Sequence, residues 1–323
     1  MATRGRHRSR TSGTSSEPMT LRAPPGERDL DSLRSFGVVN LDKPPGPSAH
    51  QVAAWIRNAT DQDRVAHGGT LDPKVTGCLP VLLGDAARMA QVFDDAVKEY
   101  VTVLELHDQA PADIADIVAE FETEVYQKPP RKSAVKRQLR ARRIHSLDIL
   151  EQGERRLLLR VRCASGTYIR KLCHDIGLAA GTGAHMGDLR RTATGTFDDA
   201  SLSTMHDLVD ALAFADEGDE GKLREIVQPA ERALVHLPRV TIAPSAAREV
   251  EDGAPVYAPG VIETGPAEAG DATPETGSQV VCVTPDGAAV CLGTLVATRT
   301  PTAASLSNST ACWCRSSFRG QRR

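Results

Sequence analysis

The stretch HGGTLDPKVTGCLPVLLG, residues 67–84, carries the strongest structural signals in the chain. Its Gly-Gly step permits positive φ and a close approach to another molecule. Asp72 directly precedes Pro73, which disfavours the helical region for Asp72 and holds its carboxylate on an extended segment. The apolar run 79–83 predicts a buried strand beside that loop. Such an arrangement can present a nucleophile or a base. The alternative is a simple turn in which Asp72 caps its own backbone.

Composition and charge predict a globular protein with one local basic segment. With 323 residues, 40% of them hydrophobic, the chain is long enough for about two domains. The net charge of −3 argues against a uniformly basic nucleic-acid binder. Eight Lys or Arg and no acids lie between residues 125 and 147, whereas residues 197–290 hold 18 acids and five Lys or Arg. This asymmetry predicts a basic footprint for a polyanion on an otherwise acidic surface.

Several common classes of site and segment find no support in the sequence. The seven cysteines form no Cys-x-x-Cys pair and no zinc spacing, so we expect buried free thiols and no metal. No nucleotide-binding glycine motif is present, so we expect no cofactor. The N-terminus lacks the apolar part of a secretory signal, and no apolar run approaches the roughly 20 residues that cross a bilayer. We therefore expect a soluble, cytoplasmic protein that does not bind membranes.

Fourteen contiguous residues, GGTLDPKVTGCLPV at 68–81, closely resemble the catalytic motif of the TruB branch of pseudouridine synthases. The segment PKVT at 73–76 is more similar to the motif of the archaeal and eukaryotic dyskerin-like enzymes than to that of the bacterial tRNA enzyme. The resemblance extends from about Gly37 to Ala297 and is weakest in the second domain. It places the catalytic carboxylate on Asp72.

The same resemblance assigns further site residues. Arg170, in GTYIR, matches the catalytic arginine that would keep the carboxylate ionised and oriented. Tyr100 matches the tyrosine that stacks on the target base, although alone it could equally be a core tyrosine. Substrate contacts are implied for His67, Tyr168, Leu189 and Lys43, and for Arg131, Lys132, Lys136 and Arg137 in a basic segment similar to the family's thumb loop. His67 could also be an ordinary loop histidine.

We expect an α+β protein. The resemblance implies a mixed, largely antiparallel sheet of the pseudouridine synthase type, followed by a small β-rich PUA-like domain. The predicted division is a disordered tail at 1–27, a catalytic domain at 28–236 with a thumb-like loop at 126–145, an RNA-binding PUA-like domain at 237–297, and an unstructured tail at 298–323. That last segment turns abruptly basic and lacks a strand pattern. We hypothesise that it is out of register with the ancestral reading frame; a basic RNA-binding tail is the rival.

Hydrophobic spacing predicts individual elements within this division. A helix is expected at 51–58, capped by Ser48, with Trp55 in its apolar stripe. Further helices are expected at 85–96 and 111–124. Another should begin at Gly166 and bury the stripe Ile169, Leu172, Cys173 and Ile176.

Three functions remain open. Pseudouridylation breaks the N-glycosidic bond of uridine and rejoins the base through C5, with Asp72 as nucleophile or as base. The enzyme could act in a box H/ACA guide-RNA particle on rRNA with small partner proteins, and so in ribosome biogenesis. It could instead modify the T-loop uridine of tRNA alone. The dyskerin-like wording favours the guided role. A non-catalytic RNA-binding scaffold is the third reading, and the intact set of Asp72, Tyr100 and Arg170 speaks against it.

Overall fold

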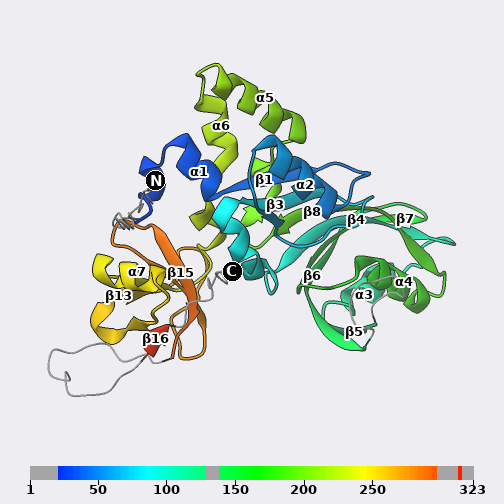
Figure 1. Ribbon diagram of the computed structural model, residues 1–323. Helices are drawn as coiled ribbons and strands as arrows, with labels where there is room; N and C mark the ends of the chain where they lie inside the picture. Colours follow the sequence, from blue (N-terminus) through cyan, green and yellow to red (C-terminus); the bar gives the residue numbers. More distant parts are fainter. Residues whose placement is uncertain (1–20, 129–137, 297–311, 315–323) are drawn as a thin grey trace, which may run out of the picture.

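The computed structural model describes residues 21–128, 138–296 and 312–314. A large sheet runs through the first of two domains, with strand order β10-β1-β3-β8-β4-β7-β6-β5, while β2 pairs with β3 and β9 with β8 (Figure 1). All of these pairs are antiparallel except β3 with β8, so the predicted mixed, largely antiparallel sheet is confirmed. Its strands are β1 (Gly37–Lys43), β2 (Val65–His67), β3 (Thr76–Leu83), β4 (Lys98–Leu106), β5 (Glu124–Gln127), β6 (Arg140–Gln152), β7 (Arg156–Cys163), β8 (Ala184–Thr194), β9 (Phe197–Asp198) and β10 (Val227–Pro229).

Helices flank the sheet in two groups. In Figure 1, α5 and α6 lie above one end of the sheet, whereas α3 and α4 lie beside β5 and β6 at the other end. The helices of this domain are α1 (Leu30–Ser35), α2 (Ala49–Ala59), α3 (Ile114–Ala119), α4 (Ile169–Ala179), α5 (Met205–Asp216) and α6 (Gly221–Ile226), with 3-10 segments η1 (Pro25–Glu27), η2 (Gly84–Phe93), η3 (Asp199–Ser201) and η4 (Ala230–Ala233). None of the helices that the structure describes is long and apolar enough to cross a membrane.

Strand β3 forms the centre of the core. Every residue from 77 to 83 is buried. Successive side chains of a strand point to opposite faces: Leu79, Val81 and Leu83 pack in one hydrophobic cluster, and Cys78 and Leu82 in another. Because both faces are covered, the run reads as continuously apolar in the sequence. This strand gives the loop that precedes it a rigid anchor.

The local signals for α2 and α4 are largely confirmed. Ser48 caps α2 in a reciprocal capping box with Gln51, and the whole predicted stripe of α4 is buried. Trp55, however, is 48% exposed. Its place in the buried stripe was wrong, because the buried face of α2 is filled by Ala49, Val52, Ala53 and Ile56.

Other predicted boundaries change. The helix expected at 111–124 is only α3, because β5 begins at Glu124. The helix expected at 85–96 is the 3-10 segment η2, and α4 begins three residues later than expected, after Tyr168 as its N-cap.

The predicted thumb-like loop is shorter than 126–145. Residues 126–127 belong to β5 and residues 140–145 to β6, and the two strands pair from Glu124↔Arg143 to Gln127↔Arg140. The alternating burial along β6 fits a strand with one covered face. The four basic side chains expected to contact substrate, Arg131, Lys132, Lys136 and Arg137, lie outside the described residues.

The second domain is small and rich in strands. Its sheet has the order β13-β11-β14-β15, and a turn around residues 285–287 joins β14 to β15 in a hairpin. Its elements are β11 (Arg239–Ile242), α7 (Pro244–Glu251), β12 (Val256–Tyr257), η5 (Ala258–Gly260), β13 (Val261–Gly265), β14 (Gln279–Val283) and β15 (Ala289–Thr294). β16 (Cys312–Cys314) pairs with β12, so these three residues differ from the unstructured tail expected at 298–323. The mixed sheet flanked by helices and the small β-rich domain match the predicted α+β class.

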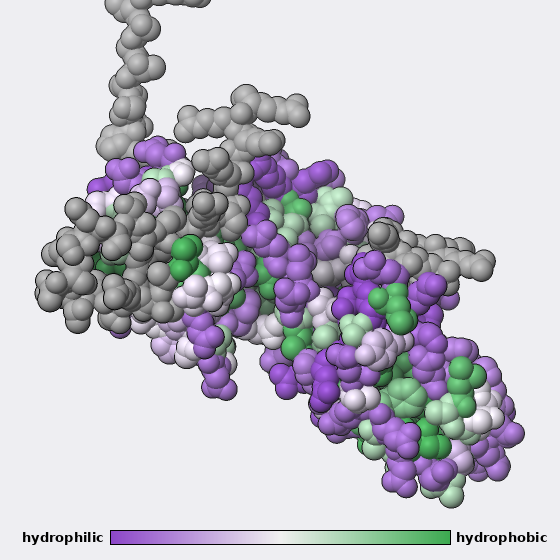
Figure 2. Space-filling view, turned by 90° about the horizontal axis from the view of Figure 1, so that it is seen from below, coloured by the Kyte–Doolittle hydropathy of each residue, from purple (hydrophilic) through white to green (hydrophobic). Residues whose placement is uncertain are grey.

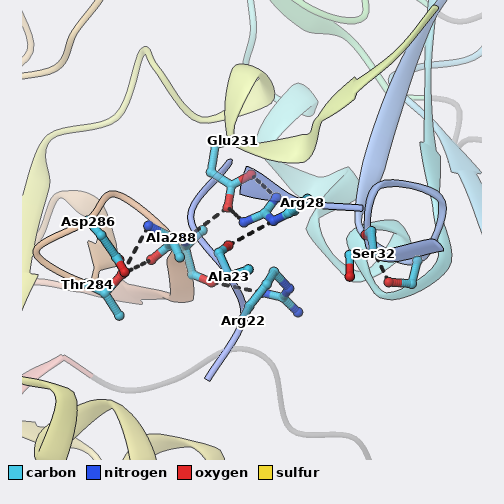
Figure 3. A network of polar contacts seen from close by, with 10 residues as sticks. Arg22, Ala23, Arg28, Ser32, Glu231, Thr284, Asp286 and Ala288 are labelled. Carbon is cyan, nitrogen blue, oxygen red and sulfur yellow. Dashed lines mark hydrogen bonds and ion pairs between the residues drawn. The ribbon is translucent and has the colours of Figure 1, made fainter. Parts of the chain in front are cut away.

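The two domains share a core and a polar network (Figure 3). Arg28 donates two hydrogen bonds, of 2.8 and 2.7 Å, to the carboxylate of Glu231, which also accepts the backbone N–H of Ala289 at 3.0 Å. Arg22 donates to the Ala289 carbonyl at 2.9 Å. Residues 21–27 are therefore ordered against the second domain, which corrects the expectation of disorder across all of 1–27.

Most of the face seen in Figure 2 is hydrophilic, and the apolar patches on the lobe that carries α3 and α4 are small and separated. The exposed apolar side chains of that lobe include Tyr126, Leu139, Leu150 and Leu178.

Candidate active site

Asp72 lies in the loop between β2 and β3 and faces the start of α4. Arg170 is the second residue of α4, next to the buried Ile169, and its Nη2 donates to Asp72 Oδ2. Both side chains are 58% exposed. The helix turn that buries Ile169 therefore points Arg170 out of the core and onto the carboxylate, about 100° further around the axis. The pair is open to a ligand.

Lys43 lies beneath the same loop. Its side chain is fully buried, and its Nζ donates to the carbonyls of Pro44, Pro73 and Val75 at 2.9, 3.0 and 2.7 Å. Burial lowers the pKa of the Lys43 ammonium, and the negative charge of Asp72 opposes that effect. Because the side chain does not reach the surface, the predicted substrate contact by Lys43 is wrong. Lys43 instead fixes the backbone on either side of Lys74.

Tyr100 and Leu189 lie on neighbouring strands, β4 and β8. Tyr100 pairs with Arg191 and Thr102 pairs with Leu189 across these strands. Both Tyr100 and Leu189 are partly buried and pack against the same two hydrophobic clusters. Burial raises the pKa of the Tyr100 phenol, and the positive charge of Arg191 opposes this. A tyrosine and a leucine at the junction of two clusters form an apolar surface of the kind that a flipped base needs.

His67 ends β2, immediately before the Gly-Gly step. Its ring meets that of His50 edge to face, with centroids 4.8 Å apart. The two histidines and Arg57 line a cavity of about 340 Å³ between α2 and β2. Burial lowers the pKa of His67, as does the proximity of His50. The structure thus places His67 at the base of the Asp72 loop.

Tyr168 caps the N-terminus of α4, two residues before Arg170. Its backbone N–H donates to Gln127 Oε1 at 2.8 Å, and its carbonyl accepts from Gln127 Nε2 at 3.2 Å. Gln127 is 2% exposed and ends β5. This amide holds the start of α4 in place. No motif pointed to Gln127, since a glutamine before a basic run reads as polar surface.

Two cations near Tyr100 are buried, which the sequence analysis did not predict. Arg191 is 1% exposed and Lys98 is 5% exposed. Lys98 Nζ donates to Ala96 O at 2.8 Å and to Ser165 Oγ at 3.1 Å. Burial, together with the charge of Arg191, lowers the pKa of Lys98 to about 8. A charged residue in a strand pattern normally indicates an exposed position, so the burial of Arg191 and Lys98 was not predictable from the sequence.

The buried thiols are shielded from solvent. Five cysteines whose side chains the structure describes, Cys78, Cys163, Cys173, Cys282 and Cys291, are buried, as predicted, and the first three of these are free thiols. Burial raises the pKa of Cys78 and Cys173 to about 12 and that of Cys163 to about 11. Nucleophilic chemistry near Asp72 therefore does not come from Cys78, because a thiolate is the reactive form.

Comparison with known families and structures identifies the class of this protein. Residues 57–169 match the N-terminal domain of TruB family pseudouridylate synthases, residues 170–235 the C-terminal domain of tRNA pseudouridylate synthase B, and residues 11–53 the DKCLD (NUC011) domain. The chain is thus a pseudouridine synthase, an isomerase of uridine in RNA.

Individual relatives agree with this class. A protein of Haloarcula marismortui named "Probable tRNA pseudouridine synthase B" is 93% identical over 296 residues, which cover 92% of this chain and 94% of that protein. One of the same name from Pyrococcus horikoshii is 48% identical over 243 residues, covering 74% of this chain and 73% of that protein. The chain belongs to the TruB family of pseudouridine synthases.

Two solved structures share their fold with 94% of this chain. A chain of a Cbf5–Nop10–Gar1 complex superposes with a TM-score of 0.82 at 42% identity, covering 94% of this chain and 91% of that chain. A chain of an H/ACA RNP bound to a substrate RNA containing 2′-deoxyuridine gives a TM-score of 0.80 at 39% identity, with the same coverage. Both matches extend over the small β-rich domain as well as the large sheet.

Proposed function

We propose that this protein is the catalytic subunit of a box H/ACA guide-RNA particle that modifies uridines of rRNA, and so acts in rRNA processing and ribosome biogenesis. The observation that carries the proposal is the similarity to chains of H/ACA complexes over 94% of the chain, second domain included. The PKVT sequence directly after Asp72 also supports the guide-RNA role. Guide RNA, rRNA and small proteins comparable to Nop10 and Gar1 would be its partners.

In this proposal the Asp72 loop performs the chemistry. Asp72 acts on the sugar of the target uridine as nucleophile or base, and Arg170 holds its carboxylate. Tyr100 stacks on the flipped base, and Leu189 forms the wall of the pocket. The exposed ion pair and the adjacent apolar surface support these roles. His67 and Tyr168 would contact the RNA near the site, and Arg131, Lys132, Lys136 and Arg137 would contact phosphates.

A stand-alone tRNA pseudouridine synthase is the second candidate. It is favoured by the names of the relatives, including the one that is 93% identical. The two candidates share the reaction and the site residues. They differ in what presents the uridine, which is a guide RNA in one case and the fold of the tRNA T-loop in the other.

Tritium release from C5-labelled uridine tests both candidates, because C5 must lose its hydrogen. Purified protein is given a tRNA transcript alone, and separately rRNA with a guide RNA and partner proteins; Asp72→Asn is the control in each. Release that requires the guide supports the proposal, whereas release from tRNA alone supports the second candidate. RNA binding without release in any reaction would contradict both and indicate a scaffold.

A further inference from the structure

Arg191 is a buried charge without a carboxylate partner among the described residues. It is the largest fully buried side chain of the described chain, at 1% exposure. Its Nε donates to Cys78 O at 2.7 Å, and its Nη2 donates more weakly to Gly69 O at 3.4 Å. Burying an arginine among carbonyls costs free energy that an apolar side chain of similar volume would avoid. This cost in free energy indicates that the buried Arg191 has a role other than filling the core.

The two carbonyls flank the Asp72 loop, that of Gly69 at its beginning and that of Cys78 in β3, just after its end. Gly69 lies three residues before Asp72, and Cys78 lies six residues after it. Gly69 has a φ of +109°, and a Cβ at that position would lie 3.5 Å from Arg191 Nη1. A Cβ would make only ordinary contact with the guanidinium, so it is the positive φ that favours glycine at this position. The planar guanidinium therefore bridges the entrance and the exit of the loop.

The same side chain faces Tyr100. Arg191 lies opposite Tyr100 in the β4–β8 ladder because a bulge after Glu99 leaves Thr192 unpaired. The Oγ1 of Thr192 donates to Glu99 Oε1 at 3.0 Å and holds this bulge. Bulges of this kind re-aim side chains beside active sites. The guanidinium also interacts with the Tyr100 phenol, which counters the effect of burial on the pKa of Tyr100.

We propose that Arg191 is a positioning residue that locks the Asp72 loop and Tyr100 into one fixed geometry. It does not touch the RNA, because it is buried. It keeps the carboxylate that acts on the sugar at a constant distance from the ring that stacks on the base. The inference rests on the proposed roles of Asp72 and Tyr100. Lysine would keep the charge but not the fork that reaches both carbonyls.

The test compares Arg191→Lys and Arg191→Gln with Arg190→Met under single-turnover tritium release, on the RNA that the parent protein modifies. Arg190 is the matched control, because it adjoins Arg191 but pairs with Asp42 at 2.9 and 3.0 Å. For folded Arg191→Lys we expect a rate about 10- to 100-fold lower, since small misplacements of reacting groups have effects of that size. The dissociation constant for RNA should change less than about threefold, because no RNA contact is lost.

A second readout reports on the contact itself. The protein has four tyrosines, so 3-fluorotyrosine labelling gives a ¹⁹F spectrum in which Tyr100→Phe assigns one resonance. In Arg191→Gln the pKa of this phenol should rise, because the opposing positive charge is gone; in Arg190→Met it should not.

Three outcomes would overturn the proposal. They are a parent-like rate in folded Arg191→Lys, an equal loss of rate in Arg190→Met, and a failure of both Arg191 variants to fold, which would assign the side chain to the core. None of these is confused with a failure of the proposed function, because that would show as an inactive parent protein or as an active Asp72→Asn.

Discussion

The outer and inner sides of the Asp72 loop hold their charges in opposite ways. Outside, Asp72 and Arg170 pair with each other, and each is 58% exposed. Inside, Lys43 and Arg191 are buried and donate to three carbonyls of the loop, those of Gly69, Pro73 and Val75, and to that of Cys78 in β3 directly after it. An exposed ion pair contributes little to stability but is available to a substrate. The buried cations are unavailable to a substrate, and they fix the backbone from which the pair acts.

The largest expected effect is the loss of turnover on substitution of Asp72, on the outer side of the loop. We expect Asp72→Asn to lower turnover at least about a thousandfold, as loss of a reacting group does. RNA affinity should remain within a few fold, because the proposed phosphate contacts lie elsewhere. Tritium release and filter binding on the same preparation measure the two quantities. A loss of affinity as large as the loss of rate would instead make Asp72 a structural residue.

Substitutions on the inner side of the loop should lower the stability of the folded protein. We expect Lys43→Met to lower the free energy of unfolding by about 3 kcal/mol, because three carbonyls lose a charged donor. Lys74→Met, on the same loop but exposed, should change it by less than about 0.5 kcal/mol. Urea denaturation of both variants checks this. Equal stability of the two would remove the distinction between the sides of the loop.

Arg170→Lys is a conservative substitution in the exposed ion pair with Asp72. Lysine keeps the positive charge but cannot reproduce the planar fork, so we expect a rate about tenfold lower. Stability should stay within about 0.5 kcal/mol, because the pair is largely exposed. Stopped-time tritium release and thermal unfolding separate the two effects. A clear drop in melting temperature would show that the pair is structural.

The smallest effect concerns pH and Lys98. In the folded protein, burial lowers the pKa of Lys98 to about 8, against an ordinary value of 10.5. Between these values the unfolded chain binds more protons, so the contribution of Lys98 to stability should rise with pH. From pH 8 to 9 we expect a gain of about 1 kcal/mol relative to Lys98→Met, by urea denaturation at both pH values. An unchanged difference between the proteins would contradict the shifted pKa.

The sequence predicted the parts of the site that are exposed or locally patterned. The run 79–83 is a buried strand, and the stripe on α4 follows directly from helical spacing. The motif resemblance led to Asp72 and Arg170, which the structure brings together from positions 98 residues apart. Such features depend on local periodicity or on a contiguous motif, and both can be read from one sequence.

The parts that the sequence did not predict depend on tertiary contacts. In the sequence, Lys43 and Arg191 resemble surface residues. Their partners are backbone carbonyls, which every residue carries and which no sequence motif marks. Residues 140–145 read as a basic loop because their charges hide an alternation that only pairing with β5 reveals. Trp55 is left outside the core because Ala49, Val52, Ala53 and Ile56 already fill the buried face of α2.

The most direct test of the account is a crystal structure of Asp72→Asn bound to an RNA that presents an unmodified target uridine. The account predicts the flipped uracil stacked on the Tyr100 ring and against Leu189, with the ribose facing residue 72. It also predicts that Arg191 keeps its bonds to Gly69 and Cys78. A target base that lies away from Tyr100, or a ribose remote from residue 72, would contradict the assignment of this loop as the active site.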